Sequence, residues 1–273
     1  AANLQKLRAL AKKHKLYFIE DSCDTFAAEY DGKPSGMYSD ISTTSFYGSH
    51  IITAGGGGGM LMMDNPEWYN RARMLRGWGR SSSLFKDSET IEDRFKAKIG
   101  TIPYDAKFIF GEVGYNFLPT EISAAFGNAQ LDKLTLFKKT REKNFKSLLN
   151  FFKKYEKYFV LPIQDAKLRT QWLAFPLTIR QDAPFTRLEI TQFLEENNIQ
   201  TRPIFTGNIL LQPGFKRYLS SKDTFPVAQT VMQQSFLIGC HHGMEEKHLE
   251  KLTQTFTSYL EDLAPQKTLR KKK

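Results

Sequence analysis

A run of five consecutive glycines, Gly55–Gly59, is the feature that most restricts how this 273-residue chain can fold. Residues without a Cβ atom allow a backbone to approach a ligand closely, or to turn where other residues cannot. A strand predicted over 41–46 precedes the run, and its end carries Ser45-Phe46-Tyr47-Gly48-Ser49-His50. The glycine spacing matches neither the G-x-G-x-x-G fingerprint nor the G-x-x-x-x-G-K-[ST] phosphate loop. It therefore argues against a Rossmann or P-loop motif here.

A second group of polar residues follows an apolar strand predicted over 16–20. The residues of this group are Glu20, Asp21, Ser22, Cys23 and Asp24. Reactive groups gather at the carboxyl ends of strands in open α/β sheets, so we expect both polar groups to share one site. Simpler interpretations also fit the pattern: the acids as helix caps, the glycines as a flexible connector and His50 as an ordinary hydrogen-bonded residue.

The composition indicates a folded protein with a sizeable core. With 41% hydrophobic residues, the chain is long enough for one or two domains. It has no apolar run of bilayer-spanning length, and its first residues resemble an amphipathic helix rather than a signal peptide. Two cysteines are too few for a disulfide framework, which favours the reducing cytoplasm.

The formal net charge of +10 is concentrated near the C-terminal end. Lys267 and residues 270–273 supply five of these charges, which leaves +5 for the rest of the chain (10 minus 5). We expect residues 263–273 to form a solvated, disordered basic tail. No basic stripe with interleaved aromatics is apparent, which argues against nucleic-acid binding. A mildly basic body suits an anionic small-molecule substrate.

Hydrophobic periodicity predicts alternating elements in the first half of the chain. The expected elements are a helix over 2–14, strands over 16–20, 41–46 and 60–63, and a helix over 66–76 with Pro66 in its first turn. Such alternation favours a mainly parallel sheet. Residues 80–105 show no clear pattern and are expected to form a loop. A helix over 120–131 follows, with Thr120 as its N-cap.

The second half predicts a long helix and an α+β unit. Apolar residues from Leu134 to Phe152 lie on one stripe of a helix that bridges into a second domain. Expected elements after it are strands over 159–163, 172–179 and 200–205 and helices over 187–196 and 244–260. We therefore expect a large domain over 1–131, a bridging helix and small C-terminal domain over 132–262, and the tail over 263–273.

Several motifs of this chain resemble those of the DegT-type sugar aminotransferases, which are fold-type I enzymes dependent on pyridoxal phosphate (PLP). The matching stretches are 20–24, 36–40, 45–50, the glycine run, 71–79, 114–116, 124–134 and 201–212. The resemblance implies the three-layer aspartate aminotransferase fold with a small α+β C-terminal domain. The chain has no initial methionine, and we expect it to lack the opening part of the large cofactor-binding domain.

The decisive departure from these aminotransferases is His50, which stands where the family normally carries the lysine that binds PLP covalently. This replacement resembles the nucleotide-sugar 3-dehydratases, which use pyridoxamine phosphate (PMP) on 4-keto-6-deoxy sugars in dideoxysugar and O-antigen synthesis. The resemblance implies a cytoplasmic PMP- or PLP-dependent dehydratase acting on a nucleotide-diphospho-sugar. A sugar aminotransferase and an inactive remnant are the alternatives.

The resemblance also assigns roles to individual residues around the cofactor. Asp21 matches the aspartate that pairs with the pyridine nitrogen, and Asp24 lies where many relatives have a glutamine near the ring hydroxyl. Ser45 matches a serine that binds the cofactor phosphate. Asn116 matches an asparagine that reaches the phosphate in the partner subunit, which implies a homodimer with shared sites. Each assignment has a simpler alternative: Asp21 as a cap of the following turn, Ser45 as an ordinary serine at a strand end, and Asn116 as a turn residue.

Substrate chemistry is expected from four further positions. An imidazole with an ordinary pKa of about 6.5 can take up a proton at neutral pH, which suits His50 to act as the base. Tyr47 is placed to assist proton transfer, or is an aromatic core residue. Arg202, with Asn208 nearby, is expected to meet the phosphates of the substrate, or is a surface arginine.

An iron–sulfur cluster found in one reductive relative is not expected in this chain. Cys23 matches the first of its four cysteines, but Ser81 and Ser83 occupy the next two positions. Hydroxyls are poor substitutes for thiolates on iron. The usual Gly-Glu-Gly-Gly of the family is all glycine at Gly56, which loosens the loop. We expect residues 240–242, Cys-His-His, to form a loop without a metal.

Overall fold

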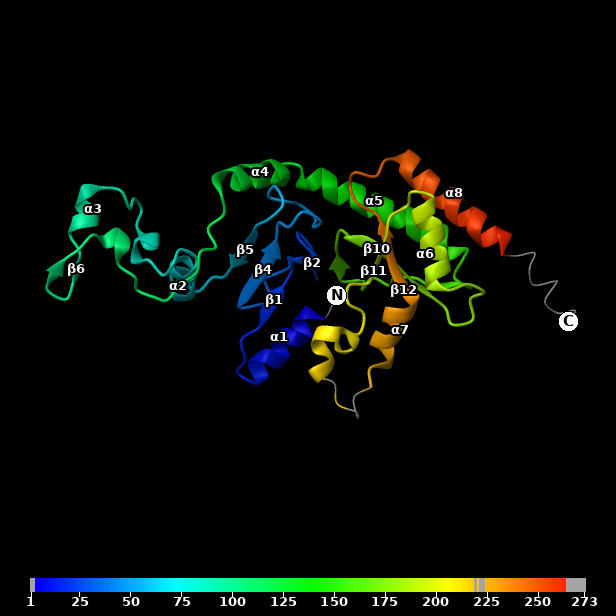
Figure 1. Cartoon of the computed structure of the whole chain (residues 1–273), viewed down its shortest axis with the longest axis horizontal. Helices are drawn as coiled ribbons and strands as arrows, with labels where there is room; N and C mark the ends of the chain where they lie inside the picture. The colour runs from blue at the N-terminus through cyan, green and yellow to red at the C-terminus, as the bar shows by residue number, and fades with distance from the viewer. Residues whose placement is uncertain (1–2, 219, 221–223, 264–273) are drawn as a thin grey trace, which may run out of the picture. The chain divides into compact units, whose positions relative to one another are not determined.

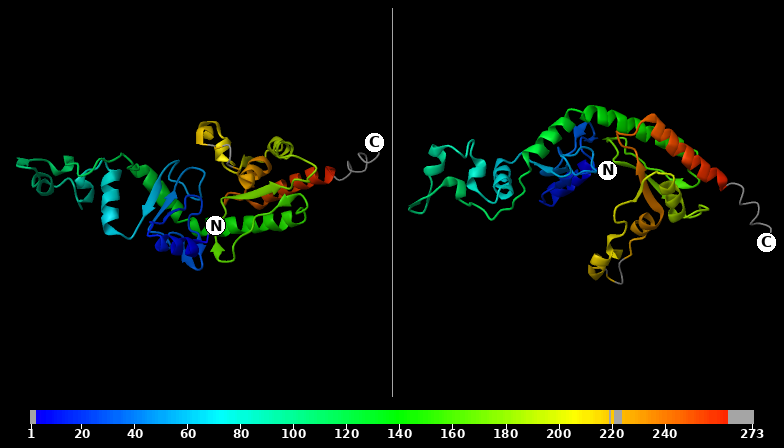
Figure 2. Two further views of the ribbon diagram at one scale, coloured as in Figure 1. Left: turned by 90° about the horizontal axis from the view of Figure 1, so that it is seen from below. Right: turned by 45° about the horizontal axis from the view of Figure 1, so that its top comes forward.

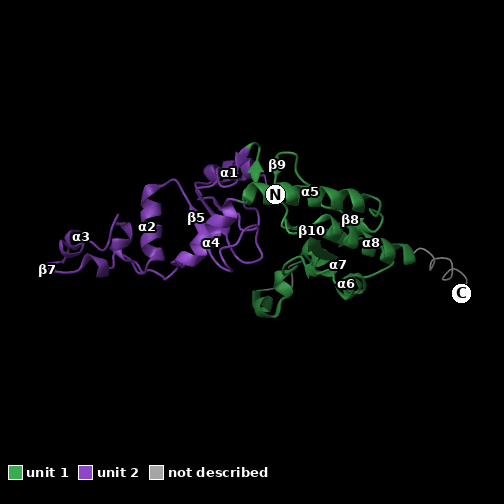
Figure 3. Ribbon diagram, turned by 90° about the horizontal axis from the view of Figure 1, so that it is seen from above, with its two compact units in different colours: residues 1, 27–32, 133–273 green, residues 2–26, 33–132 purple. Residues whose placement is uncertain are grey.

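The computed structural model describes residues 3–218, 220 and 224–263, in two compact units (Figure 3). One unit, here called the site unit, contains the chain up to Phe26 and Lys33–Asp132. The other, the C-terminal unit, contains Ala27–Gly32 and the chain from Lys133 onward. Residues 264–273, where we predicted most of the basic tail, lie outside the described residues.

A three-stranded sheet forms the centre of the site unit (Figure 1). Its order is β1-β4-β5, with β1 at Ile19–Asp21, β4 at Ile41–Ser45 and β5 at Gly59–Met62. Strands β1 and β4 run parallel, as predicted, with Asp21 opposite Thr43. Strand β5 is antiparallel to β4, because the short glycine-containing connection reverses the chain directly.

Three helices of the site unit begin directly after residues whose side chains cap them. Helix α1 (Leu4–Lys13) begins after Asn3, α2 (Pro66–Arg76) after Asn65 and α4 (Glu121–Leu131) after Thr120. In each case the side-chain oxygen of the cap accepts a hydrogen bond from a backbone N–H in the first turn. These three helices were predicted within two residues at each end.

The prediction of a featureless loop over 80–105 was wrong. This stretch and the residues just after it contain η1 (Ser81–Leu84), α3 (Ile91–Phe95), the hairpin β6 (Lys98–Ile99) and β7 (Ile102–Pro103), and η2 (Ala106–Phe108). Thr90 caps α3, and Arg94 pairs with Asp105 across the hairpin. Elements this short do not establish a hydrophobic period, so the sequence pattern does not reveal them.

The C-terminal unit is built on a four-stranded antiparallel sheet with α5 and α8 packed together beside it (Figures 1 and 2). The strand order is β11-β12-β10-β8. The bounds are β8 Phe159–Val160, β10 Ala174–Ile179, β11 Thr201–Pro203, β12 Ser235–Gly239, α5 Leu134–Lys153, α6 Arg187–Glu196 and α8 Glu246–Asp262. This unit also contains β2 Glu29–Tyr30, β9 Leu168–Arg169, η3 Ile209–Leu211, η4 Pro213–Tyr218 and α7 Pro226–Gln234, whereas β3 Lys33–Pro34 belongs to the site unit.

Strand β12 and helix α7 were not predicted, although β12 lies between two other strands. The strand is a five-residue apolar run, Ser235-Phe236-Leu237-Ile238-Gly239, that follows α7 without a break. A short apolar run next to a helix gives no period of its own. Pairing with both β10 and β11 determines its strand conformation.

Aromatic and aliphatic side chains from the sheet and from α5, α6 and α8 form the core of the C-terminal unit. Phe152 of α5 lies at its centre, where its ring contacts those of Phe159, Phe175 and Phe256. Leu148, one turn earlier on the same face of α5, is fully buried. The predicted hydrophobic stripe of α5 therefore covers the core of this unit.

Two leucines of α5 provide a matched stability test. Leu148→Ala removes a side chain that is 0% exposed and should lower the free energy of unfolding by about 2–5 kcal/mol. Leu136→Ala, at a position that is 63% exposed, should change it by about 0.5 kcal/mol or less. Chemical denaturation followed by circular dichroism measures both. Equal losses would show that α5 does not bury this face.

Candidate functional site

The two faces of the β1–β4 ribbon carry different polar residues. Successive side chains of a strand point to opposite faces, so Asp21, Thr43 and Ser45 share one face. On the other face, Glu20, Ser42 and Thr44 are buried. The adjacent carboxylates Glu20 and Asp21 therefore face different environments.

Glu20 is a structural residue. Its carboxylate accepts a hydrogen bond from the Ser22 hydroxyl at 2.7 Å and another from the backbone N–H of Gly36 at 2.9 Å. Gly36 has a positive φ of +92°, and an added Cβ would lie 2.7 Å from the Ser42 hydroxyl oxygen. Glu20 thus ties a glycine turn to the end of β1 and leaves Asp21 as the open carboxylate of the pair.

Asp21 lies at the open end of β1, and its surroundings favour the charged form. The Cys23 thiol and the Cys23 backbone N–H, at 3.1 Å, donate to this carboxylate and hold the pKa of Asp21 below its ordinary value. The Thr43 hydroxyl, at 3.5 Å, and the nearby imidazole of His50 act in the same direction. Burial raises the pKa of the Cys23 thiol, which keeps it protonated as a donor.

His50 is held in a turn directly after β4. Its backbone N–H donates to the carbonyl of Tyr47 at 3.0 Å, and the next two residues, Ile51 and Ile52, are buried at 1% and 2% exposure. The imidazole Nε2 lies 3.3 Å from Oδ1 of Asp24. The ring of Tyr47 stands edge-on to the imidazole, with the centroids 5.8 Å apart.

The glycine run forms a closed loop between β4 and β5. The backbone N–H of Phe46 donates to the carbonyl of Gly58, and that of Ala54 donates to the carbonyl of Phe46. Gly56 adopts a φ of +112°, which side chains rarely tolerate, and nothing lies within 4 Å of where its Cβ would be. Beside this loop, Ser45 Oγ accepts from the backbone N–H of Tyr47 at 3.1 Å and keeps its proton to donate.

The structure gathers five of the predicted residues in one region of the site unit: Asp21, Asp24, Ser45, Tyr47 and His50. Asn116 belongs to the same unit, where it is exposed and forms a β-bridge with Gly77. Arg202 and Asn208 belong to the C-terminal unit. Arg202 donates to the carbonyl of Thr201, and Asn208 is buried as the N-cap of η3.

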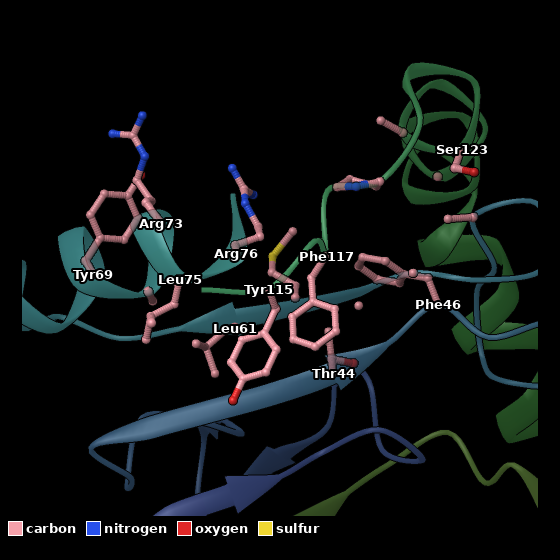
Figure 4. Close-up of a pocket in the computed structure, with 18 of the residues that line it drawn as sticks. Thr44, Phe46, Leu61, Tyr69, Arg73, Leu75, Arg76, Tyr115, Phe117 and Ser123 are labelled. Atoms are coloured by element: carbon pink, nitrogen blue, oxygen red, sulfur yellow. The ribbon is translucent and has the colours of Figure 1, made fainter. Parts of the chain in front are cut away.

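A groove of about 790 Å³ in the site unit is separate from these residues (Figure 4). The residues that line it include Thr44 of β4, Phe46 directly after β4, Tyr69 and Arg76 of α2, and Ser123 of α4. Thr44 belongs to the face opposite Asp21, and no predicted site residue lines the groove. The reactive groups therefore do not line this groove.

Within the described ranges, no three histidine, cysteine or acidic side chains are grouped so that they could hold a metal ion. Residues 240–242 form the turn after β12, which is the loop expected there. Over the same part of the chain, no helix combines the length and the apolar character needed to cross a bilayer.

Comparison with known proteins agrees with this arrangement. The model of the DegT/DnrJ/EryC1/StrS aminotransferase family matches residues 1–257. The chain belongs to this family. An E. coli GDP-4-keto-6-deoxy-D-mannose-3-dehydratase, solved with bound hydrated PLP, superimposes with a TM-score of 0.78 at 25% identity, over 93% of this chain and 63% of that one. The predicted PLP-dependent aminotransferase fold is therefore confirmed.

Two curated relatives are similar over most of this chain. The lipopolysaccharide biosynthesis protein RfbH of Salmonella typhimurium is 33% identical over 264 residues, which are 95% of this chain and 60% of that protein. The dTDP-4-dehydro-2,6-dideoxy-D-glucose 3-dehydratase of Saccharopolyspora spinosa is 32% identical over 93% of this chain and 56% of that protein. The chain thus spans about 60% or less of the length of these relatives.

Sequence reasoning missed the residues that support the site. Thr43 was passed over as part of a strand, although its position two residues before Ser45 places it on the same face. Ile51 and Ile52 follow His50 directly, and a buried apolar pair next to a polar residue is a signal that this residue is held in place. The structural role of Glu20, as distinct from the open position of Asp21, could have been inferred because successive side chains of a strand point to opposite faces.

The contacts of Asp21 generate a prediction about its pKa. Cys23→Ala removes the thiol donor and should raise the pKa of Asp21 toward its ordinary value. Cys23→Ser keeps a side-chain donor and should leave the pKa lowered. Carboxyl-carbon NMR titration of the two variants measures this difference. An unchanged pKa in Cys23→Ala would rule out the thiol as the main cause of the shift.

Proposed function

We propose that this chain is the catalytic part of an enzyme that removes the C3 hydroxyl of a nucleotide-linked 4-keto-6-deoxy sugar, with PMP or PLP as cofactor, in dideoxysugar or O-antigen synthesis. The observation that carries the proposal is His50. By the resemblance of residues 45–50 to the family's motif, His50 stands where the family carries its cofactor-binding lysine, and its charge lowers the pKa of Asp21. The named 3-dehydratase activities of the similar proteins support the same chemistry.

The residues present fit a pyridine cofactor with a phosphate. Asp21 is charged and exposed, and it forms no ion pair with another of the described residues. Ser45 and the glycine loop offer a hydroxyl and uncrowded backbone suited to an anion. When bound, such a cofactor supplies a protonated ring that withdraws electrons from the reacting carbon.

Each residue then has a task that its position allows. Asp21 holds the ring nitrogen in its protonated form, because a charged carboxylate stabilises an adjacent cation. His50 lacks the primary amine needed for covalent attachment and instead takes up and returns the proton of the reacting centre. Tyr47, whose ring meets that of His50 edge-on, is positioned to assist the departure of the C3 hydroxyl as water.

The substrate end of the proposal involves Arg202 and Asn208. Arg202 is an exposed cation on β11, and Asn208 lies six residues further along the chain. A guanidinium suits a diphosphate because it donates two hydrogen bonds in one plane. The two thiols, Cys23 and Cys240, are free, which suits a reducing cytoplasm.

We further propose a homodimer with shared sites. Asn116 is exposed rather than directed into its own unit, and its position in the family's pattern assigns it to the cofactor phosphate of the partner subunit. Phe117, the following residue, is 69% exposed and stacks on Tyr115. An exposed aromatic pair beside a polar contact residue is a composition typical of interfaces.

The two alternative functions, a sugar aminotransferase and an inactive remnant, predict different experimental results. An aminotransferase regenerates its cofactor through a covalently bound lysine, which imidazole cannot replace. Such activity would require another lysine, detectable as a stable adduct after borohydride treatment with PLP. An inactive remnant would bind no PMP in an absorbance titration.

The proposed base is tested on the natural gene product that carries this chain. His50→Asn should lower the rate of dehydration of a 4-keto-6-deoxy nucleotide sugar by roughly 10²–10⁴-fold, because the proton acceptor is lost. PMP binding, measured by absorbance, should persist. A variant that retains the full rate would refute the assignment of His50.

Shared sites are tested by mixing two inactive variants. His50→Asn and Asn116→Ala should each be nearly inactive as homodimers. A mixed dimer contains one site with an intact His50 and an intact partner Asn116, so activity should return after subunit exchange. If each subunit completes its own site, no activity will return.

A further inference from the structure

The environment of His50 identifies a positioning residue that the family's pattern does not assign. Asp24 was expected near the ring hydroxyl of the cofactor. In the structure its Oδ1 lies 3.3 Å from Nε2 of His50, and this oxygen is buried. Its side chain as a whole is 41% exposed, and that of His50 is 19% exposed. The pair is therefore partly shielded from water.

The two nitrogens of the imidazole have different surroundings. Nε2 faces the carboxylate of Asp24, whereas Nδ1 is buried and has no hydrogen-bond partner among the described residues. A carboxylate accepts hydrogen bonds and does not donate them when ionised. An imidazole that carries its proton on Nε2, the nitrogen beside Asp24, keeps its lone pair on Nδ1.

We propose that Asp24 orients His50 and fixes its tautomer, so that Nδ1 is the atom that accepts the proton in the reaction. This inference rests on the proposed function for its catalytic meaning, but the pairing itself does not. The contact has the distance of an ion pair without the alignment of a hydrogen bond. Such contacts tighten when a ligand fills the site.

Other groups near the imidazole do not replace this contact. His50 lowers the pKa of Asp21 through its charge, and Oδ1 of Asp21 accepts hydrogen bonds from Cys23 and Thr43. Tyr47 presents its ring to the edge of the imidazole. Within the described chain, Asp24 is thus the carboxylate in direct ion-pair contact with His50.

The experiment uses the natural gene product with isotope-labelled histidine and no cofactor. The nitrogen chemical shifts of neutral His50 should show the Nε2–H tautomer in the unaltered protein. A predominant Nδ1–H tautomer would overturn the proposal without any substitution. The four other histidines of the chain are assigned by single substitutions and serve as internal references.

Substitution then tests the role of the carboxylate. Asp24→Asn should raise the population of the Nδ1–H tautomer of neutral His50, because the carboxylate that can only accept from Nε2–H is replaced by an amide that can also donate. Asp64→Asn makes the same charge change at an exposed loop position and should leave the tautomer populations of His50 unchanged. Asp24→Glu keeps the carboxylate and should restore most of the Nε2–H form. Equal tautomer populations in Asp24→Asn and the unaltered protein would overturn the pairing.

Kinetics separates this inference from the proposed function. If Asp24 orients the base, Asp24→Asn should lower kcat while the KM for the sugar changes little. An Asp24→Asn enzyme that dehydrates the sugar with an unaltered kcat would refute the positioning role and leave the function standing. A changed His50 tautomer in Asp24→Asn, together with no dehydration by the unaltered protein, would refute the function and leave the pairing standing.

Discussion

The parallel pairing of β1 with β4 is the constraint on which the candidate site depends. Backbone hydrogen bonds fix the register that sets Asp21 beside Thr43. Strand alternation then directs Asp21 and Ser45 to one face and buries Glu20 on the other. A shift of one residue would exchange these faces and direct Glu20 toward the site. The hydrogen bond from the backbone N–H of Gly36 to Glu20 opposes such a shift, because it ties β1 to the segment that leads into β4.

Much of this arrangement follows from the sequence because it depends on local rules. The capping residues Asn65 and Thr120 indicate where α2 and α4 begin. The apolar stripe of α5 indicates which of its faces is buried. The meeting of Asp21 and His50 follows from the rule that strand ends share one edge of a sheet. These inferences need no knowledge of distant contacts.

The features that escaped the sequence depend on contacts between distant residues. Strand β12 is defined by its two neighbours, and the hairpin after α3 by the pairing of β6 with β7, beside the ion pair of Arg94 and Asp105. The approach of Asp24 to His50 depends on two turns, one after each strand. Turn geometry is not encoded by hydrophobic periodicity, so the sequence could place both residues in one region but not in contact.

The charges of the site are arranged in two zones that suit a ligand carrying both signs. Asp21 and Asp24 surround the imidazole with negative charge, whereas Ser45 and the glycine loop present a hydroxyl and open backbone without any carboxylate. In the proposed function, the first zone would hold the protonated ring nitrogen and the second the phosphate, since the reverse orientation would place a dianion beside two carboxylates.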